Sequence, residues 1–138
     1  MNNPPLILLA DDNPDDQSFI RDAFAYVNAN VRLKILDSGV ELLHHLKILD
    51  DEDLPSLIVL DYNMPRTNGA EALSWLRRGD TFKDIPIVLY SSNMSSLLAC
   101  KLSLMGAHCC FQKPRDVNGG VELARTLKMI AERPAVKA

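Results

Sequence analysis

The sequence of 138 residues lacks most features of a membrane, secreted or nucleic-acid-binding protein. It has no apolar run near the roughly 20 residues that a membrane-spanning helix needs. Its three cysteines, Cys100, Cys109 and Cys110, are an odd set without a CxxC pair, so neither a disulfide framework nor a zinc site is indicated. Fifteen Lys and Arg against eighteen Asp and Glu give a net charge of −3, whereas nucleic-acid surfaces are basic. We therefore expect a cytoplasmic protein with no nucleic-acid and no membrane partner.

The chain also lacks a glycine-rich phosphate loop. Its six glycines are scattered, and neither GxGxxG nor GxxxxGK[ST] occurs. What is present is an ordinary globular composition, with 47% hydrophobic and 24% charged residues. The length is that of one domain. We expect a single domain over residues 1–138, with its core from about residue 6 to residue 131.

Apolar runs alternate with amphipathic segments along the whole chain. The runs predict buried strands at Leu6–Ala10, Val31–Leu36, Leu57–Leu60, Ile87–Tyr90 and Cys109–Phe111. The segments between them carry apolar residues at helical spacing and predict helices at Asp15–Val27, Val40–Leu49, Gly69–Arg78, Ser95–Met105 and Val117–Ala131. Five strand–helix alternations predict an α/β fold with a doubly wound, five-stranded parallel sheet and five helices.

Chemically active side chains follow the predicted strands. Asp11 and Asp12 follow the first strand, Asp61 the third, Ser91 the fourth and Lys113 the fifth. Ligands of open α/β sheets bind beyond the carboxyl ends of the strands. We therefore expect these five side chains to converge at one edge of the sheet.

Three neighbouring carboxylates repel one another unless a cation compensates their charge. An all-oxygen donor set favours a hard ion, Mg²⁺ or Mn²⁺. The plainer alternative is that the acids cap helices or lie at the surface. We interpret Asp15 and Asp16 in that way, as first-turn acids favoured by the helix dipole.

Taken in order, these residues resemble the receiver domain of two-component response regulators. The resemblance covers about Leu6 to Ile130. The motifs that carry it are the acid pair, Asp61-x-x-Met64-Pro65-x-x-x-Gly69, Ser91 five residues beyond Pro86, and Gly106-Ala107 seven residues before Lys113-Pro114. The opening Asp12-Asn13-Pro14-x-Asp16 is similar to the small response regulators associated with bacterial phytochromes.

The resemblance implies a flavodoxin-like receiver fold with strand order 2-1-3-4-5, and a cis Lys113–Pro114 bond that aims Lys113 at Asp61. It implies that Asp61 is the phosphoacceptor. Asp11, Asp12, Asp61 and the backbone carbonyl of Asn63 would hold Mg²⁺, with Mn²⁺ as a substitute. Ser91 and Lys113 would each contact a phosphoryl oxygen.

The same resemblance implies a phosphorylation-switched signalling module rather than an enzyme. Its partner would be a histidine kinase or a phosphotransfer protein. With no output domain expected, its output would be protein contact or phosphate passing.

The sequence departs from the family pattern at two positions. Cys110 stands three residues before Lys113, where the family usually has an aromatic residue, and Phe111 comes one place later. Arg115 follows Pro114 in place of the common Phe. The first change puts the usual hydroxyl–aromatic coupling in doubt, though not the phosphorylation chemistry.

Two other classes of protein place an acid or a ligand at a strand end. A haloacid-dehalogenase-type phosphatase uses an Asp-x-Asp pair, but Asn63 stands at the second position. A flavodoxin-like cofactor-binding protein is the remaining alternative, although Asp11 and Asp12 would repel a flavin phosphate.

The predicted fourth helix has two apolar stripes. Leu98, Leu102 and Met105 form the stripe expected to face the sheet, and Leu97, Cys100 and Leu104 form a second stripe that points away. Surface helices normally have a polar outer face. The second stripe therefore predicts a partner-binding face, and a homodimer is one form of it.

Overall fold

The computed structural model describes residues 3–27 and 30–133, so the two ends of the predicted domain lie outside the described residues. All ten predicted strands and helices are present, and each end lies within two residues of its predicted position. In chain order they are β1 (Leu6–Ala10), α1 (Pro14–Tyr26), β2 (Arg32–Leu36), α2 (Gly39–Lys47), the 3-10 turn η1 (Asp51–Asp53), β3 (Leu57–Asp61), α3 (Gly69–Leu76), β4 (Ile87–Ser91), α4 (Ser96–Leu104), β5 (Cys109–Gln112) and α5 (Val117–Glu132).

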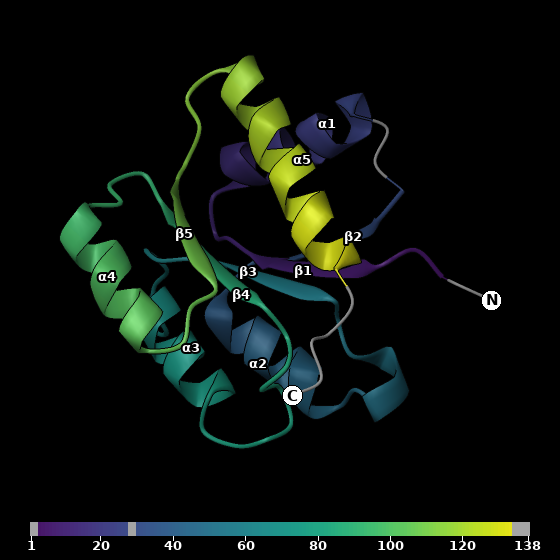
Figure 1. Cartoon of the computed structure of the whole chain (residues 1–138), viewed down its shortest axis with the longest axis vertical. Helices are drawn as coiled ribbons and strands as arrows, with labels where there is room; N and C mark the ends of the chain where they lie inside the picture. The colour runs from purple at the N-terminus through teal and green to yellow at the C-terminus, as the bar shows by residue number, and fades with distance from the viewer. Residues whose placement is uncertain (1–2, 28–29, 134–138) are drawn as a thin grey trace.

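The five strands form one parallel sheet in the order β2-β1-β3-β4-β5, which confirms the predicted topology. Helices α1 and α5 cover one face, and α2, α3 and α4 cover the other (Figure 1). Side chains alternate between the two layers along each strand. Leu8, Ile58 and Leu89 pack towards α2–α4, whereas Ile7 and Val59 pack towards α1 and α5.

Side-chain caps fix where each helix begins after its strand. The five capping residues each accept a hydrogen bond from a backbone N–H in the first turn; they are Asn13, Ser38, Asn68, Ser95 and Asp116. The loops at the carboxyl edge of the sheet are therefore short and defined. None of the described helices is long and apolar enough to cross a membrane.

The predicted cis bond between Lys113 and Pro114 is wrong, because no peptide bond among the described residues is cis. The trans isomer is the intrinsically favoured form of an X–Pro bond. The orientation expected of Lys113 is nevertheless present, with its Nζ 3.1 Å from Asp61 Oδ2. The side chain is aimed by its own dihedral angles, which do not require a cis bond after it.

Gly69 begins α3 directly beneath the carboxyl edge, and its backbone is too close to β3 for a side chain. An added Cβ would lie 2.8 Å from Tyr62 Cα and 2.9 Å from the carbonyl oxygen of Asp61. We expect Gly69→Ala to lower the free energy of unfolding by about 1–3 kcal/mol, measured by urea titration, because backbone must move. The control is Gly79→Ala, where nothing lies within 4 Å of the new Cβ. Equal stability of the two variants would contradict this account.

Candidate functional site

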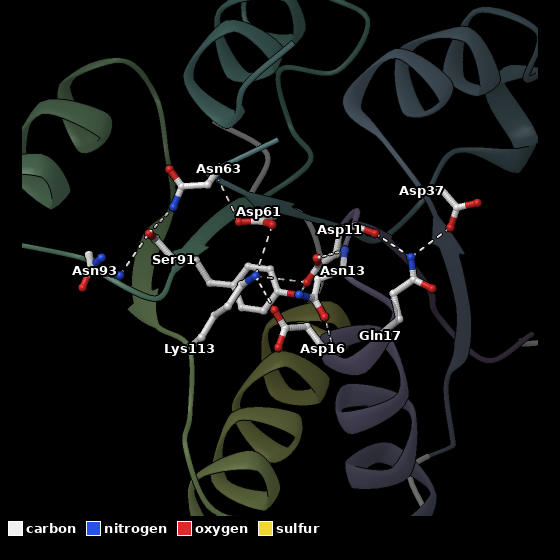
Figure 2. A network of polar contacts seen from close by, with 11 residues as sticks. Asp11, Asn13, Asp16, Gln17, Asp37, Asp61, Asn63, Ser91, Asn93 and Lys113 are labelled. Atoms are coloured by element: carbon white, nitrogen blue, oxygen red, sulfur yellow. Dashed lines mark hydrogen bonds and ion pairs between the residues drawn. The ribbon is translucent and has the colours of Figure 1, made fainter. Parts of the chain in front are cut away.

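Four of the five predicted site residues come from strand ends at one edge of the sheet. Asp11 directly follows β1, Asp61 ends β3, Ser91 ends β4 and Lys113 directly follows β5. Figure 2 shows these side chains in one polar network at that edge. The fifth residue, Asp12, is exposed beside Asp11.

Lys113 is the centre of the network. Its Nζ lies 2.8 Å from Asp16 Oδ2, 3.1 Å from Asp61 Oδ2 and 3.3 Å from Asp11 Oδ2. It also lies 4.8 Å from the centroid of the Tyr90 ring, within cation–π distance. Burial alone would lower the pKa of Lys113, but the bond to Asp16 and the charges of Asp11 and Asp61 raise it above its ordinary value. The side chain is therefore a fixed ammonium group.

Three carboxylates at this edge are close enough to share a metal ion. Asp11, Asp12 and Asp61 each offer an oxygen, and these atoms lie within 4.8 Å of one another. The donor set is oxygen only, as Mg²⁺ and Mn²⁺ prefer. Two of the acids are buried and one is exposed, so an ion there would be reachable from solvent.

Asp61 is only 2% exposed, and this burial dominates its titration. Burial raises the pKa of Asp61 to about 6, and the negative charge of Asp11 adds a smaller increase. The Lys113 ammonium and the Asn63 N–H act in the opposite direction and lower this pKa. The N–H of Asn63 donates to Asp61 Oδ1 at 3.0 Å. One carboxylate oxygen thus accepts from backbone and the other contacts Lys113.

Asp11 is fully buried and is held at both oxygens. Its Oδ1 accepts from the N–H of Asn13 at 3.0 Å, and its Oδ2 accepts from the hydroxyl of Tyr90. The same Oδ2 faces Lys113. Burial and the neighbouring charge of Asp11 raise the pKa of Tyr90 above its ordinary value, so its hydroxyl stays protonated as a donor.

Ser91 belongs to a separate branch of the network. Its Oγ accepts from Asn63 Nδ2 at 3.0 Å and from the N–H of Asn93 at 3.1 Å. Asn63 thus connects Ser91 to Asp61 with its side-chain amide and its backbone N–H (Figure 2). That the Asn63 carbonyl is a metal ligand stays a prediction.

The sequence reasoning missed two side chains that contact Lys113, those of Asp16 and Tyr90. Asp16 does lie in the first turn of α1, as predicted, but its carboxylate contacts Lys113. Tyr90 pairs with Asp61 across β3 and β4, and it faces the opposite layer from Leu89. Strand pairing predicts that a residue of β4 lies beside the site, but it does not predict which group the side chain of that residue contacts.

The Cys110 position is half-buried among the residues that pack with α4, and its Sγ lies 3.9 Å from the carbonyl oxygen of Ala99. Phe111 faces the other layer, with α1 and α5. Successive residues of a strand point to opposite faces. Phe111 therefore does not take the place of the missing aromatic.

The buried charge of Asp61 predicts a pH-dependent stability when metal is removed. Between about pH 4 and pH 6 the folded chain holds a proton that the unfolded chain has released, so stability falls as pH rises through this range. The variant Asp61→Asn has no carboxyl group at this position, so its stability does not fall for this reason. We expect it to raise the free energy of unfolding by about 1–3 kcal/mol at pH 7.5 and much less at pH 4.5.

The measurement is urea unfolding in a chelator, followed by the fluorescence of Trp75, the single tryptophan. Asp53→Asn, at an exposed acid of η1, is the matched control. A stability gain for Asp61→Asn that does not change with pH would contradict the explanation that the gain comes from removing the buried charge of Asp61.

Known proteins match this chain along nearly its whole length. The family model described as the response regulator receiver domain matches residues 7–125. The two-component response regulator ORR5 of Oryza sativa subsp. japonica is 30% identical over 110 residues, which cover 80% of this chain and 78% of the relative. The response regulator Rcp1 of Synechocystis is 27% identical over 119 residues, which cover 84% and 81%.

Some relatives are longer. The match spans 61% of FilR2 of Methanothrix harundinacea, named as a probable methanogenesis regulatory protein, and 7% of the hybrid signal transduction histidine kinase D of Dictyostelium discoideum. Among solved structures, the Mn²⁺-bound form of Rcp1 superposes with a TM-score of 0.81 at 22% identity, covering 98% of this chain and all of that one. The phosphorylated cyanobacterial phytochrome response regulator RcpA gives 0.77 at 25% identity, covering 94% and 92%. The chain therefore belongs to the response regulator receiver family of two-component signalling.

Proposed function

We propose that Asp61 accepts a phosphoryl group from a histidine kinase or a phosphotransfer protein, and that this modification switches protein contacts. One observation carries the proposal. A buried carboxylate, Asp61, lies 3.1 Å from the ammonium of Lys113 and within 4.8 Å of the carboxylate oxygens of Asp11 and Asp12. This arrangement provides a nucleophile, a fixed positive charge and a metal-binding donor set at one point. The family assignment favours this signalling role over the flavin-binding alternative.

Asp61 would act as the nucleophile towards phosphorus. As its oxygen bonds to phosphorus, the bond from phosphorus to the donor nitrogen breaks, and the donor histidine keeps that electron pair. The N–H of Asn63 orients the carboxylate by holding Oδ1. Lys113 places positive charge where a phosphoryl oxygen would arrive, which offsets the charge that develops there.

Asp11, Asp12, Asp61 and the carbonyl of Asn63 would hold Mg²⁺, or Mn²⁺ in its place. The chemistry of the donor set supports this, because three carboxylates lie together and only two of them, Asp11 and Asp61, contact the single ammonium, which leaves an excess of negative charge. The bound ion would supply positive charge that compensates the incoming phosphoryl oxygens. Without it the carboxylates would repel the phosphodonor.

Ser91 would donate its hydroxyl to a phosphoryl oxygen after transfer. Its Oγ already accepts two hydrogen bonds, from Asn63 and Asn93, and its own proton stays available for donation. A shift of Ser91 towards the phosphoryl group would disturb both bonds. Asn93 lies in the segment that leads from β4 to α4, so the disturbance would reach that helix.

Labelling with a small phosphodonor tests the proposal. We expect a labelled phosphoryl donor to modify wild-type protein in Mg²⁺ or Mn²⁺, and modification to fall to background in excess chelator or in Asp61→Asn. Asp12→Ala should raise the Mg²⁺ concentration that gives half-maximal labelling by tenfold or more, because it removes a predicted ligand. Ser91→Ala should still be labelled, since its role follows transfer.

Labelled residues are identified by mass spectrometry, and Asp53→Asn is the control for loss of an exposed acid. Equal labelling with and without chelator would refute the metal requirement. A label on another residue would refute the role of Asp61. A yellow, flavin-loaded preparation would instead favour the cofactor-binding alternative.

We also propose that α4 mediates a weak homodimer. Leu97 and Leu104 are 81% and 86% exposed, and Cys100 between them is exposed as well. Lys101 is the single charged residue of α4, so the stripe offers little to a partner of opposite charge but is self-complementary in a two-fold pair. Three side chains cover only part of the ~1,200 Å² of a stable interface, so association should depend on concentration.

Leu97→Glu combined with Leu104→Glu should abolish such a dimer, because it would bring like charges together across the two-fold axis. We expect wild-type protein to show a concentration-dependent rise in sedimentation coefficient that the double variant lacks. Val40→Glu with Met129→Glu changes two other exposed apolar positions and is the control. Wild-type protein that stays monomeric with and without phosphodonor would rule out the homodimer.

A further inference from the structure

Lys113 makes its shortest contact with Asp16, not with the expected phosphoacceptor. The distance to Asp16 Oδ2 is 2.8 Å, against 3.1 Å to Asp61 Oδ2. Figure 2 shows Asp16 at the start of α1, with its carboxylate directed to the Lys113 ammonium. The backbone N–H of Asp16 donates to the side chain of Asn13, which caps the helix and fixes the position of this turn.

The surroundings of Asp16 separate it from the metal-binding carboxylates. The group of acids close enough to share an ion consists of Asp11, Asp12 and Asp61, and does not include Asp16. The side chain of Asp16 is 39% exposed, whereas that of Lys113 is 11% exposed. Asp16 is therefore the most exposed of the three carboxylates that contact the ammonium.

The ammonium is thus held from several directions. The buried carboxylates of Asp11 and Asp61 and the more exposed carboxylate of Asp16 each contact it, and the ring of Tyr90 lies 4.8 Å away. A lysine side chain has many rotamers and is a flexible carrier of charge. Without Asp16, the ammonium would keep its contacts with Asp11, Asp61 and Tyr90 but lose its shortest ion pair, so it would be held less firmly.

We propose that Asp16 is a positioning residue, which holds the Lys113 ammonium beside Asp61 so that it is in place when a phosphoryl group arrives. This inference rests on the proposed phosphoacceptor function of Asp61. Fixing a charge before the reaction avoids the cost of ordering it in the transition state. Asp16 keeps this contact after transfer, when one partner of Lys113 has become an acyl phosphate.

Asp16 also has a second, opposing effect, because its negative charge repels an anionic phosphodonor. Asp15 provides the matched control. It lies in the same first turn of α1, carries the same charge and has no contact with Lys113 among the described interactions. A comparison of Asp16→Asn with Asp15→Asn therefore separates the loss of the contact from the loss of one charge.

The first experiment measures the rate of phosphorylation by a small phosphodonor at saturating Mg²⁺. We expect Asp16→Asn to be about threefold to tenfold slower than Asp15→Asn, the range for a partly exposed charge-assisted contact. The Mg²⁺ concentration for half-maximal rate should not change. In a Lys113→Ala background, Asp16→Asn should have no further effect, because the two residues act as one unit.

The second experiment does not depend on phosphorylation. Acetic anhydride is reacted with unphosphorylated protein, and acetylation of Lys113 is followed by mass spectrometry, with exposed Lys101 as the internal reference. We expect Lys113 to be modified at least threefold faster in Asp16→Asn than in Asp15→Asn, since the amine loses its shortest ion pair, which favours the charged and unreactive form. Urea unfolding confirms that both variants fold.

The outcomes distinguish the two proposals. If wild-type protein is never labelled by phosphodonor, the proposed function fails, while faster acetylation would still establish the contact between Asp16 and Lys113. If wild-type protein is labelled but Asp16→Asn matches Asp15→Asn in both experiments, the positioning role is overturned. A slower rate that persists in the Lys113→Ala background would also overturn it, because Asp16 would then act by another route.

Discussion

The ammonium of Lys113 is the interaction on which this edge of the protein depends. Three carboxylates lie within 3.3 Å of it. They belong to the residue after β1, the last residue of β3 and the first turn of α1, while Lys113 itself follows β5. Two of those carboxylates, Asp11 and Asp61, are buried, and a buried charge without a partner is strongly destabilising. One side chain therefore joins the β1–α1 segment to the ends of β3 and β5, which are far from it in sequence. Without the ammonium, the buried carboxylates of Asp11 and Asp61 would repel each other.

The positive charge of Lys113 compensates the buried carboxylates only in part, which is consistent with a functional site. The pKa of Asp61 is raised to about 6 although Lys113 and the Asn63 N–H both favour its charged form, so burial outweighs these two contacts. A protein selected for stability alone would have an uncharged residue here. The remaining excess of negative charge is what a divalent cation would neutralise, so the same imbalance that lowers the stability of the metal-free protein favours metal binding.

The sequence predicts the fold well because its signals are local and repeated. Each buried run is bounded by a cap or a proline, and alternation of strands with helices admits few topologies. Ligands of such sheets bind beyond the carboxyl ends of the strands, and parallel strands end at one edge, so the sequence predicts that Asp11, Asp61 and Lys113 lie together. It does not find Asp16, which a helix supplies, or Tyr90, which lies inside β4. The incorrect cis bond came from resemblance, since no pattern of residues encodes the isomer.

β4 connects the two layers of the protein through neighbouring residues. Tyr90 packs on the side of α1 and α5 and bonds Asp11, while Ser91 bonds Asn63 and Asn93. The segment after Ser91 is tied to the sheet a second time, since the N–H of Met94 donates to the Gln112 side chain of β5. With Cys110 in place of an aromatic, no large side chain links β5 to α4 at that position. A displacement of Ser91 would therefore reach α4 mainly through the backbone of residues 92–95, and only weakly through side-chain repacking.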